Sequence, residues 1–183
     1  MTVLGFDDRD GFIWLNWRGH MRNVWLALVV LAAMTRPAHA EPDNSVARAQ
    51  LQRVVEIFRT SIIAKDGSTL GSLFMPAGGS WIKVMDDETY QRVKATQPGV
   101  AKLKPGTYQD FVKFLGASQQ WLEEKFLNVR IHTDGAVASV YFDFVFLVDD
   151  KETNRGNETW QLVNTGDGWK INALIYSTDQ AKL

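Results

Sequence analysis

The spacing of apolar residues changes at Trp121, and this change constrains the fold more than any other feature of the chain. Beyond it, apolar residues recur at every second position in four segments, about 122–131, 137–148, 157–164 and 169–178. Residues typical of tight turns separate the segments: Asp134-Gly135, Asp149-Asp150-Lys151 and Gly166-Asp167-Gly168. The pattern predicts a meander of antiparallel strands.

Before Trp121 the apolar spacing is mostly helical. Ser45 is expected to cap a long helix ending near Lys65, with one apolar stripe made of Leu51, Val54, Val55, Phe58, Ile62 and Ile63. A short helix at 69–74 capped by Ser68, a strand at 80–84, a helix at 86–96, a basic loop at 97–106 and a helix at 107–116 are expected to follow. Helices followed by an antiparallel sheet predict an α+β fold, with the helices packed on the sheet.

Residues 21–40 have the features of a secretory signal peptide. Met21-Arg22-Asn23 precedes about a dozen apolar residues, and Ala38-His39-Ala40 resembles a cleavage site. The apolar run is shorter than the roughly 20 residues that span a bilayer. We therefore expect residues 1–40 to be an upstream extension plus a signal peptide, 41–183 to be a single domain, and the protein to be periplasmic or secreted without a stable membrane span.

Charge and residue usage exclude several kinds of site. Residues 41–183 hold 16 Lys and Arg against 18 Asp and Glu, which gives no electrostatic reason to expect nucleic-acid binding. The chain has no cysteine, and His132 is the one histidine after the signal segment. A turn beside His132 places it at the surface, so neither a Ser-His-Asp triad nor a zinc site is expected. No cofactor and no metal are predicted.

The turn lengths predict which strand residues share a face of the sheet. One face gathers Phe142 and Phe144 and is expected to pack on the first helix. Polar side chains interrupt this face, and they either satisfy backbone groups or orient a ligand. The second interpretation predicts a cavity for a small apolar or aromatic molecule, lined by Phe58, Trp81, Phe142, Phe144, Gln161, Asn172 and Tyr176.

The opposite face is predicted to carry Arg130, Tyr141, Asp143, Glu158 and Trp160. Its aromatic residues favour a homodimer interface on this outer side of the sheet. An alternative is an active site in which Asp143 or Glu158 acts as a base and Tyr141 or Tyr176 stabilises an oxyanion. No catalytic residue is assigned by the sequence.

Between Arg130 and Asp179 the chain resembles a known family. Asp134-Gly135 with Ala138, Trp160-Gln161-Leu162 and Gly168-Trp169-Lys170-Ile171 are similar to strand motifs of the nuclear transport factor 2-like superfamily, specifically its SnoaL-like branch. The resemblance implies a conical α+β half-barrel with a pocket between sheet and helices, and often a dimer. It does not imply one chemistry, because the fold hosts isomerases, dehydratases, cyclases and ligand-binding proteins.

The catalytic arrangements known in this family are not matched. His132 is expected in a turn, where it cannot supply the His-Asp arrangement of dehydratase-type members, and the first helix has Phe58 where a ketosteroid isomerase-like member would have a tyrosine. The leading hypothesis is therefore an exported, non-catalytic SnoaL-like domain that binds a small apolar or aromatic ligand. The alternatives are a carboxylate-dependent isomerase or hydrolase-like enzyme and a homodimeric envelope subunit.

Overall fold

The computed structural model describes residues 44–77 and 79–179. The predicted signal peptide lies outside these ranges. Within them, no helix combines the length and the apolar character needed to cross a membrane.

Short polar side chains accept backbone hydrogen bonds at the start of α3, α4 and α5, but not at the start of α2. α2 (Ser45–Ala64) starts after Asn44 rather than being capped by Ser45. α3 (Gly67–Ser72) is capped by the Asp66 carboxylate, not by the predicted Ser68, and α4 (Asp87–Thr96) is capped in the same way by Asp86. α5 (Tyr108–Ala117) has the predicted cap, in which Thr107 Oγ1 accepts from Asp110 N at 3.1 Å.

Six strands form one sheet in the order β2-β1-β6-β5-β4-β3. The strands are β1 (Ser80–Met85), β2 (Leu103–Gly106), β3 (Leu122–Thr133), β4 (Val137–Val148), β5 (Lys151–Asn164) and β6 (Trp169–Thr178). All neighbours are antiparallel except β1 and β6, which run parallel. β2 was predicted to be a loop because it contains Pro105. Its position at the sheet edge explains how the proline is accommodated.

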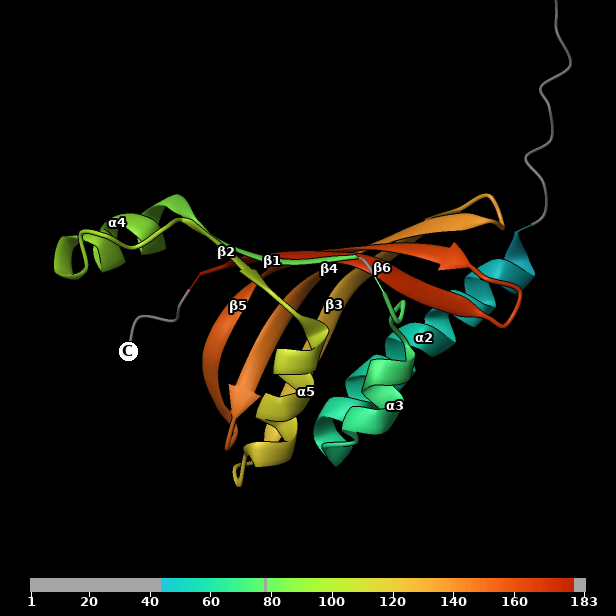
Figure 1. The fold of residues 1–183 in the computed structure, drawn as a ribbon, viewed down its shortest axis with the longest axis horizontal. Helices are drawn as coiled ribbons and strands as arrows, with labels where there is room; N and C mark the ends of the chain where they lie inside the picture. Colours follow the sequence, from blue (N-terminus) through green and yellow to red (C-terminus); the bar gives the residue numbers. More distant parts are fainter. Residues whose placement is uncertain (1–43, 78, 180–183) are drawn as a thin grey trace, which may run out of the picture. The chain divides into compact units, whose positions relative to one another are not determined.

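Helices α2, α3 and α5 lie on one side of the curved sheet, whereas α4 lies near the far ends of β1 and β2 (Figure 1). The covered face carries Val140, Phe142 and Phe144, which are buried with Leu51 and Phe58 of α2. The prediction that the phenylalanine-rich side of β4 packs on the first helix is confirmed.

A bulge between β4 and β5 overturns part of the predicted face assignment. Leu147 pairs with Glu152, but Phe146 pairs with Asn154, so one extra residue enters β5. Because side chains alternate, one extra residue reverses the faces of the rest of the strand. Glu158 and Trp160, predicted on the outer face, therefore lie on the inner face, and both are buried.

Two further bulges change the neighbouring strands. Between β5 and β6, Leu162 pairs with Ile171 and Gln161 with Ala173, which restores Tyr176 to the inner face and leaves Asn172 exposed. Between β3 and β4 the register shifts across Leu127 and Arg130. Leu127 and Val129 are 49% and 40% exposed, and the inner positions of this strand are Leu122, Glu124, Phe126 and Ile131.

The outer face keeps only some of its predicted residues. Arg130 and Tyr141 are exposed there, with the Arg130 guanidinium 5.9 Å from the centre of the Tyr141 ring. Asp143 also faces outward and accepts hydrogen bonds from Asn128 and Asn157. Trp160 cannot contribute to an interface on this face, because its side chain is in the core.

Candidate functional site

A cavity of about 170 Å³ lies between the inner face of the sheet and helices α2 and α5. Three strands and the two helices supply its aromatic walls, and three polar side chains from β3 and β5 join Tyr176 of β6 inside it. The lining residues are Phe58, Trp81, Phe111, Phe114, Glu124, Phe144, Phe146, Asn154, Glu158 and Tyr176. A dry apolar cavity of roughly 150 Å³ can hold benzene, so this volume suits one six-membered ring.

The aromatic walls form one connected cluster. Phe111 of α5 lies between Phe58 of α2 and Trp81 of β1, with ring centroids 6.5 Å and 5.4 Å away. Tyr176 meets Trp81 edge-on at 6.2 Å and Phe144 at 6.1 Å. Tilted and edge-on contacts of this kind are favourable, and they hold the rings around the cavity in defined positions.

Two glutamates lie inside this aromatic shell. Glu124 is 5% exposed and Glu158 is 4% exposed. Burial raises the pKa of Glu158 to about 8. Burial, together with the nearby Glu158, raises the pKa of Glu124 well above its ordinary value. Two carboxyls in one low-dielectric site cannot both ionise near neutral pH, so the pair retains a proton there.

Glu158 is held in place by its neighbours in the sheet. The indole Nε1 of Trp160 donates a hydrogen bond to Glu158 Oε1, which favours the ionised form and partly opposes the effect of burial on the pKa. Tyr176 pairs with Glu158 across β5 and β6, so the two side chains are adjacent on the inner face. Burial raises the pKa of the Tyr176 phenol, a hydrogen bond with Trp81 lowers it, and the charges of Glu158 and Glu124 raise it further.

Asn154 adds an unsatisfied polar atom to the cavity. Its Oδ1 is buried, and no hydrogen-bond partner for it is found within residues 44–77 and 79–179. Gly156, two residues further along β5, allows the β6 backbone to come close, since a Cβ at this position would lie 2.0 Å from Ser177 O. A buried acceptor without a partner is costly, so a ligand that brings a hydrogen-bond donor is favoured here.

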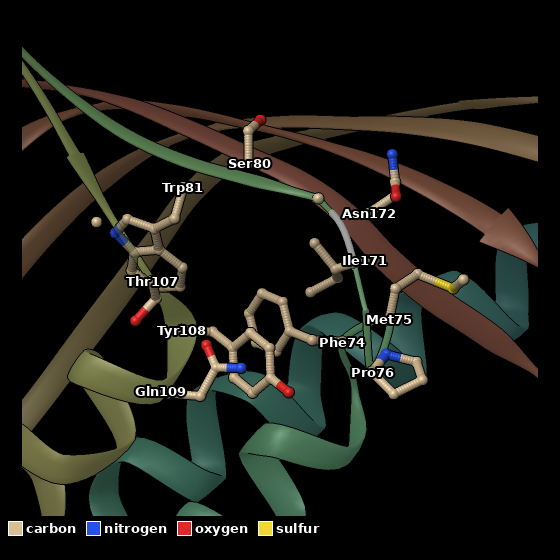
Figure 2. A pocket seen from close by; sticks show the side chains of 12 residues that line it. Phe74, Met75, Pro76, Ser80, Trp81, Thr107, Tyr108, Gln109, Ile171 and Asn172 are labelled. Carbon is tan, nitrogen blue, oxygen red and sulfur yellow. The ribbon is translucent and has the colours of Figure 1, made fainter.

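A second open hollow, of about 200 Å³, shares Trp81 with this cavity. Figure 2 shows Trp81, Phe74 and Tyr108 around it, and the last two rings stack at 4.6 Å with an interplanar angle of 4°. Trp81 lines both spaces, so its indole forms the wall between them.

We call the space between the sheet and helices α2 and α5 the glutamate cavity. Four of the seven predicted ligand-binding residues line it: Phe58, Trp81, Phe144 and Tyr176. Phe142 is instead fully buried against Phe126 and Trp160. Gln161 is exposed on the outer face. Asn172 is also exposed, and it lines the open hollow instead (Figure 2). The prediction that Gln161 and Asn172 lie on the inner face was wrong, because it did not include the bulges.

Sequence reasoning missed Glu124 and Asn154 and placed Glu158 on the wrong face. One signal was available: Gly156 interrupts β5, and an isolated glycine in a strand often marks a bulge or a close backbone approach. Another was the alternation of Glu158 with Trp160 and Leu162, which groups the acid with two large apolar residues. Phe111, Phe114 and Phe146 were also missed as lining residues.

The available groups define the chemistry that the cavity can perform. A carboxyl that titrates near neutral pH can donate a proton and take it back, and a neighbouring tyrosine can stabilise charge on a substrate oxygen. His132 is exposed and lies outside the cavity. Among the residues that the model describes, no three His, Cys, Asp or Glu side chains are grouped so as to hold a metal.

Comparison with known proteins identifies the fold. No family model and no curated protein matches the sequence. Among solved structures, a candidate dehydratase of the NTF2-like family from Streptomyces avermitilis aligns with a TM-score of 0.54 and 19% identity, covering 76% of this chain and 99% of its own. A candidate scytalone dehydratase from Novosphingobium aromaticivorans aligns with a TM-score of 0.55 and 13% identity, over 75% and 87% of the two chains.

A third similar structure has no stated activity. It is a variant of Rv3472, a Mycobacterium tuberculosis protein of unknown function, with a TM-score of 0.55, 14% identity and 76% coverage of both chains. At these identities the likeness concerns the fold alone. The domain has an NTF2-like fold, as its sequence motifs predicted.

Proposed function

We propose that this domain is a proton-transfer enzyme whose cavity binds a small molecule of about one ring, with Glu158 as the acid–base group. The observation that carries the proposal is the position of Glu158, which is buried near a second carboxyl, lines an aromatic cavity and has a pKa raised to about 8. Such a carboxyl is protonated at neutral pH and can act as a general acid. This observation favours the carboxylate-dependent enzyme over the non-catalytic ligand-binding protein.

The roles of the other residues follow from their contacts. Tyr176, next to Glu158 in the sheet, donates to an oxygen on which negative charge develops. Glu124 holds the retained proton when Glu158 ionises, because burial and the charge of Glu158 raise the pKa of Glu124. Asn154 Oδ1 accepts from a hydroxyl of the substrate, because it lacks another partner among the described residues. The aromatic walls bind the ring and exclude water.

The reaction class that fits these groups is the loss of water from, or the isomerisation of, a small hydroxylated ring. In an elimination, the ionised member of the Glu124–Glu158 pair removes a proton from the carbon next to a carbonyl. The protonated member of the pair transfers its proton to the departing hydroxyl. Two of the structurally similar proteins are named as candidate dehydratases, which is consistent with this class but does not assign it.

The test uses 3-hydroxycyclohexanone in D₂O, because this molecule has one ring, a carbonyl and a hydroxyl. The wild-type protein is expected to accelerate formation of 2-cyclohexenone and deuterium entry next to the carbonyl. Glu158→Gln should lower the rate by about 10²-fold or more. Asp143→Asn changes a half-buried carboxylate on the outer face, outside the cavity, and should leave the rate unchanged. Equal rates with wild type, Glu158→Gln and buffer would contradict proton transfer by this site.

We also propose that the protein is an exported member of the SnoaL-like branch. The signal-peptide pattern in residues 21–40 and the motifs at Asp134-Gly135 and Gly168-Trp169 support this. N-terminal sequencing of protein recovered from the cell envelope should yield a chain that starts at Glu41. Recovery only of uncleaved protein from the cytoplasm would contradict export.

A further inference from the structure

A cavity of about 540 Å³ lies under α4, between this helix, the edge strand β2 and its neighbour β1. It does not share a lining residue with the glutamate cavity. Its walls combine apolar side chains, including Met85, Val93 and Leu103, with basic ones and two threonines, Thr89 and Thr178.

Two lysines face each other across β1 and β2 in this cavity. Lys83 pairs directly with Lys104 in the strand register. No acidic side chain in the described ranges forms an ion pair with either of them, whereas Lys102 nearby is paired with Asp87. Like charges placed directly opposite each other in a sheet are destabilising. The two lysines therefore lack a negative charge that would compensate this repulsion.

Lys83 is also partly buried. Burial, and secondly the charge of Lys104, lower the pKa of Lys83. Both effects oppose protonation of the ammonium group, and an anion bound next to it would relieve both.

Thr178 supplies an independent observation at the end of β6. Its side chain is fully buried and lines the same cavity, yet its Oγ1 has no hydrogen-bond partner in the part of the chain that the model covers. An unsatisfied buried hydroxyl is unfavourable, and native structures contain few of them. The cavity thus presents a hydroxyl and two ammonium groups that can all donate.

We propose that this cavity is a binding site for a small organic anion, a carboxylate with an aliphatic portion. Lys83 and Lys104 bind the charged oxygens, Thr178 Oγ1 donates to one of them, and the apolar walls under α4 contact the aliphatic portion. The inference does not depend on the proposed enzymatic function, because it uses no residue of the glutamate cavity.

The test measures calorimetrically the binding of octanoate and octanamide, which have nearly the same shape but differ in charge. Octanoate should bind at least tenfold more tightly to the wild-type domain. Lys83→Gln should lower its affinity about tenfold. Lys94→Gln removes a lysine of α4 that does not line the cavity and should leave the affinity unchanged.

Thr178→Val separates a binding role from a structural one. Valine has the same shape without the hydroxyl, so the folded state should be no less stable, while octanoate affinity falls about fivefold. Equal binding of octanoate and octanamide, or equal effects of Lys83→Gln and Lys94→Gln, would overturn the proposal. So would amide shifts in an NMR titration that centre on Glu158 rather than on α4.

Discussion

Glu158 and Tyr176 face each other across β5 and β6 on the inner side of the sheet, with Trp160 donating its indole hydrogen to the glutamate. This pair lies inside the domain because two β-bulges flank it. The bulge at Phe146–Leu147 turns Glu158 inward, and the bulge at Gln161–Leu162 keeps Tyr176 on the same side. Bulges are common next to active sites, where they redirect side chains.

The raised pKa of Glu158 predicts how stability changes with pH. The pKa of Glu158 is about 8 in the folded state, so the folded state holds the proton up to about that pH, whereas the unfolded chain releases it near 4.5, the ordinary pKa of a glutamate. Between these values the folded state binds more protons, so the free energy of unfolding falls as pH rises. Thermal unfolding of the wild type should show a melting temperature that falls across this window.

The matched variants for this measurement are Glu158→Gln and Asp143→Asn. Removing the Glu158 carboxyl should weaken the fall in melting temperature, and removing the outer-face carboxylate of Asp143 should leave the fall unchanged. A wild-type melting temperature that rises steadily from pH 5 to pH 8 would show that the glutamate pair ionises without cost.

Trp81 separates the glutamate cavity from the open hollow, so its truncation should change the size of ligand that binds. Trp81→Ala is expected to join spaces of about 170 Å³ and 200 Å³ and to improve the binding of 2-naphthol relative to phenol. Trp121→Ala, which truncates an exposed tryptophan that lines neither space, should leave the ratio unchanged. Competition calorimetry gives the ratio of the affinities for 2-naphthol and phenol. An unchanged ratio for Trp81→Ala would show that Trp81 does not separate the two spaces.

A comparison of variants at Phe142 and Phe114 distinguishes an effect on stability from an effect on ligand binding. Phe142 is fully buried outside the cavity, so Phe142→Ala should lower the free energy of unfolding by about 3–5 kcal/mol. Phe114 lines the cavity but is 46% exposed, so Phe114→Ala should cost clearly less stability and weaken the binding of phenol. Urea unfolding and calorimetry measure the two effects. Similar losses of stability for both variants would contradict the assignment.

Self-association through the outer face stays a prediction, now without Trp160. Arg130, Tyr141, Thr159 and Ile175 form a row across β3, β4, β5 and β6, and Tyr141 and Ile175 are 40% and 39% exposed. If this row forms the dimer, Tyr141→Arg should shift the protein to a monomer in size-exclusion chromatography. Val46→Arg, which places the same charge at an exposed position of α2, should not change the elution volume. The same elution volume for wild type and Tyr141→Arg would exclude the row as the interface.

Much of the fold followed from periodicity and turn residues. β4 and β6 have the predicted bounds, and the cap at Thr107 was predicted because a Thr followed three residues later by Asp is a local pattern. β2 was missed because its pairing with β1 is a tertiary contact that four residues including a proline do not indicate.

The candidate site was harder to predict because it depends on register. Phe58, Trp81, Phe144 and Tyr176 were identified from apolar spacing, and all four line the cavity. The two glutamates were not identified, because a single extra residue in β5 exchanges Glu158 with its neighbour Thr159 on the inner face, and a register shift in β3 does the same for Glu124. Turn length alone cannot specify such a bulge.

The central claim is that Glu158 is buried and keeps its proton at neutral pH. It is tested most directly by ¹³C NMR titration of the glutamate side-chain carboxyls, with Glu158→Gln and Glu124→Gln to assign the signals. We expect the Glu158 signal to titrate with an apparent pKa near 8. The Glu124 signal should titrate at lower pH in Glu158→Gln, because the charge of Glu158 raises the pKa of Glu124. A Glu158 signal that titrates near 4.5, as an exposed glutamate does, would contradict the account.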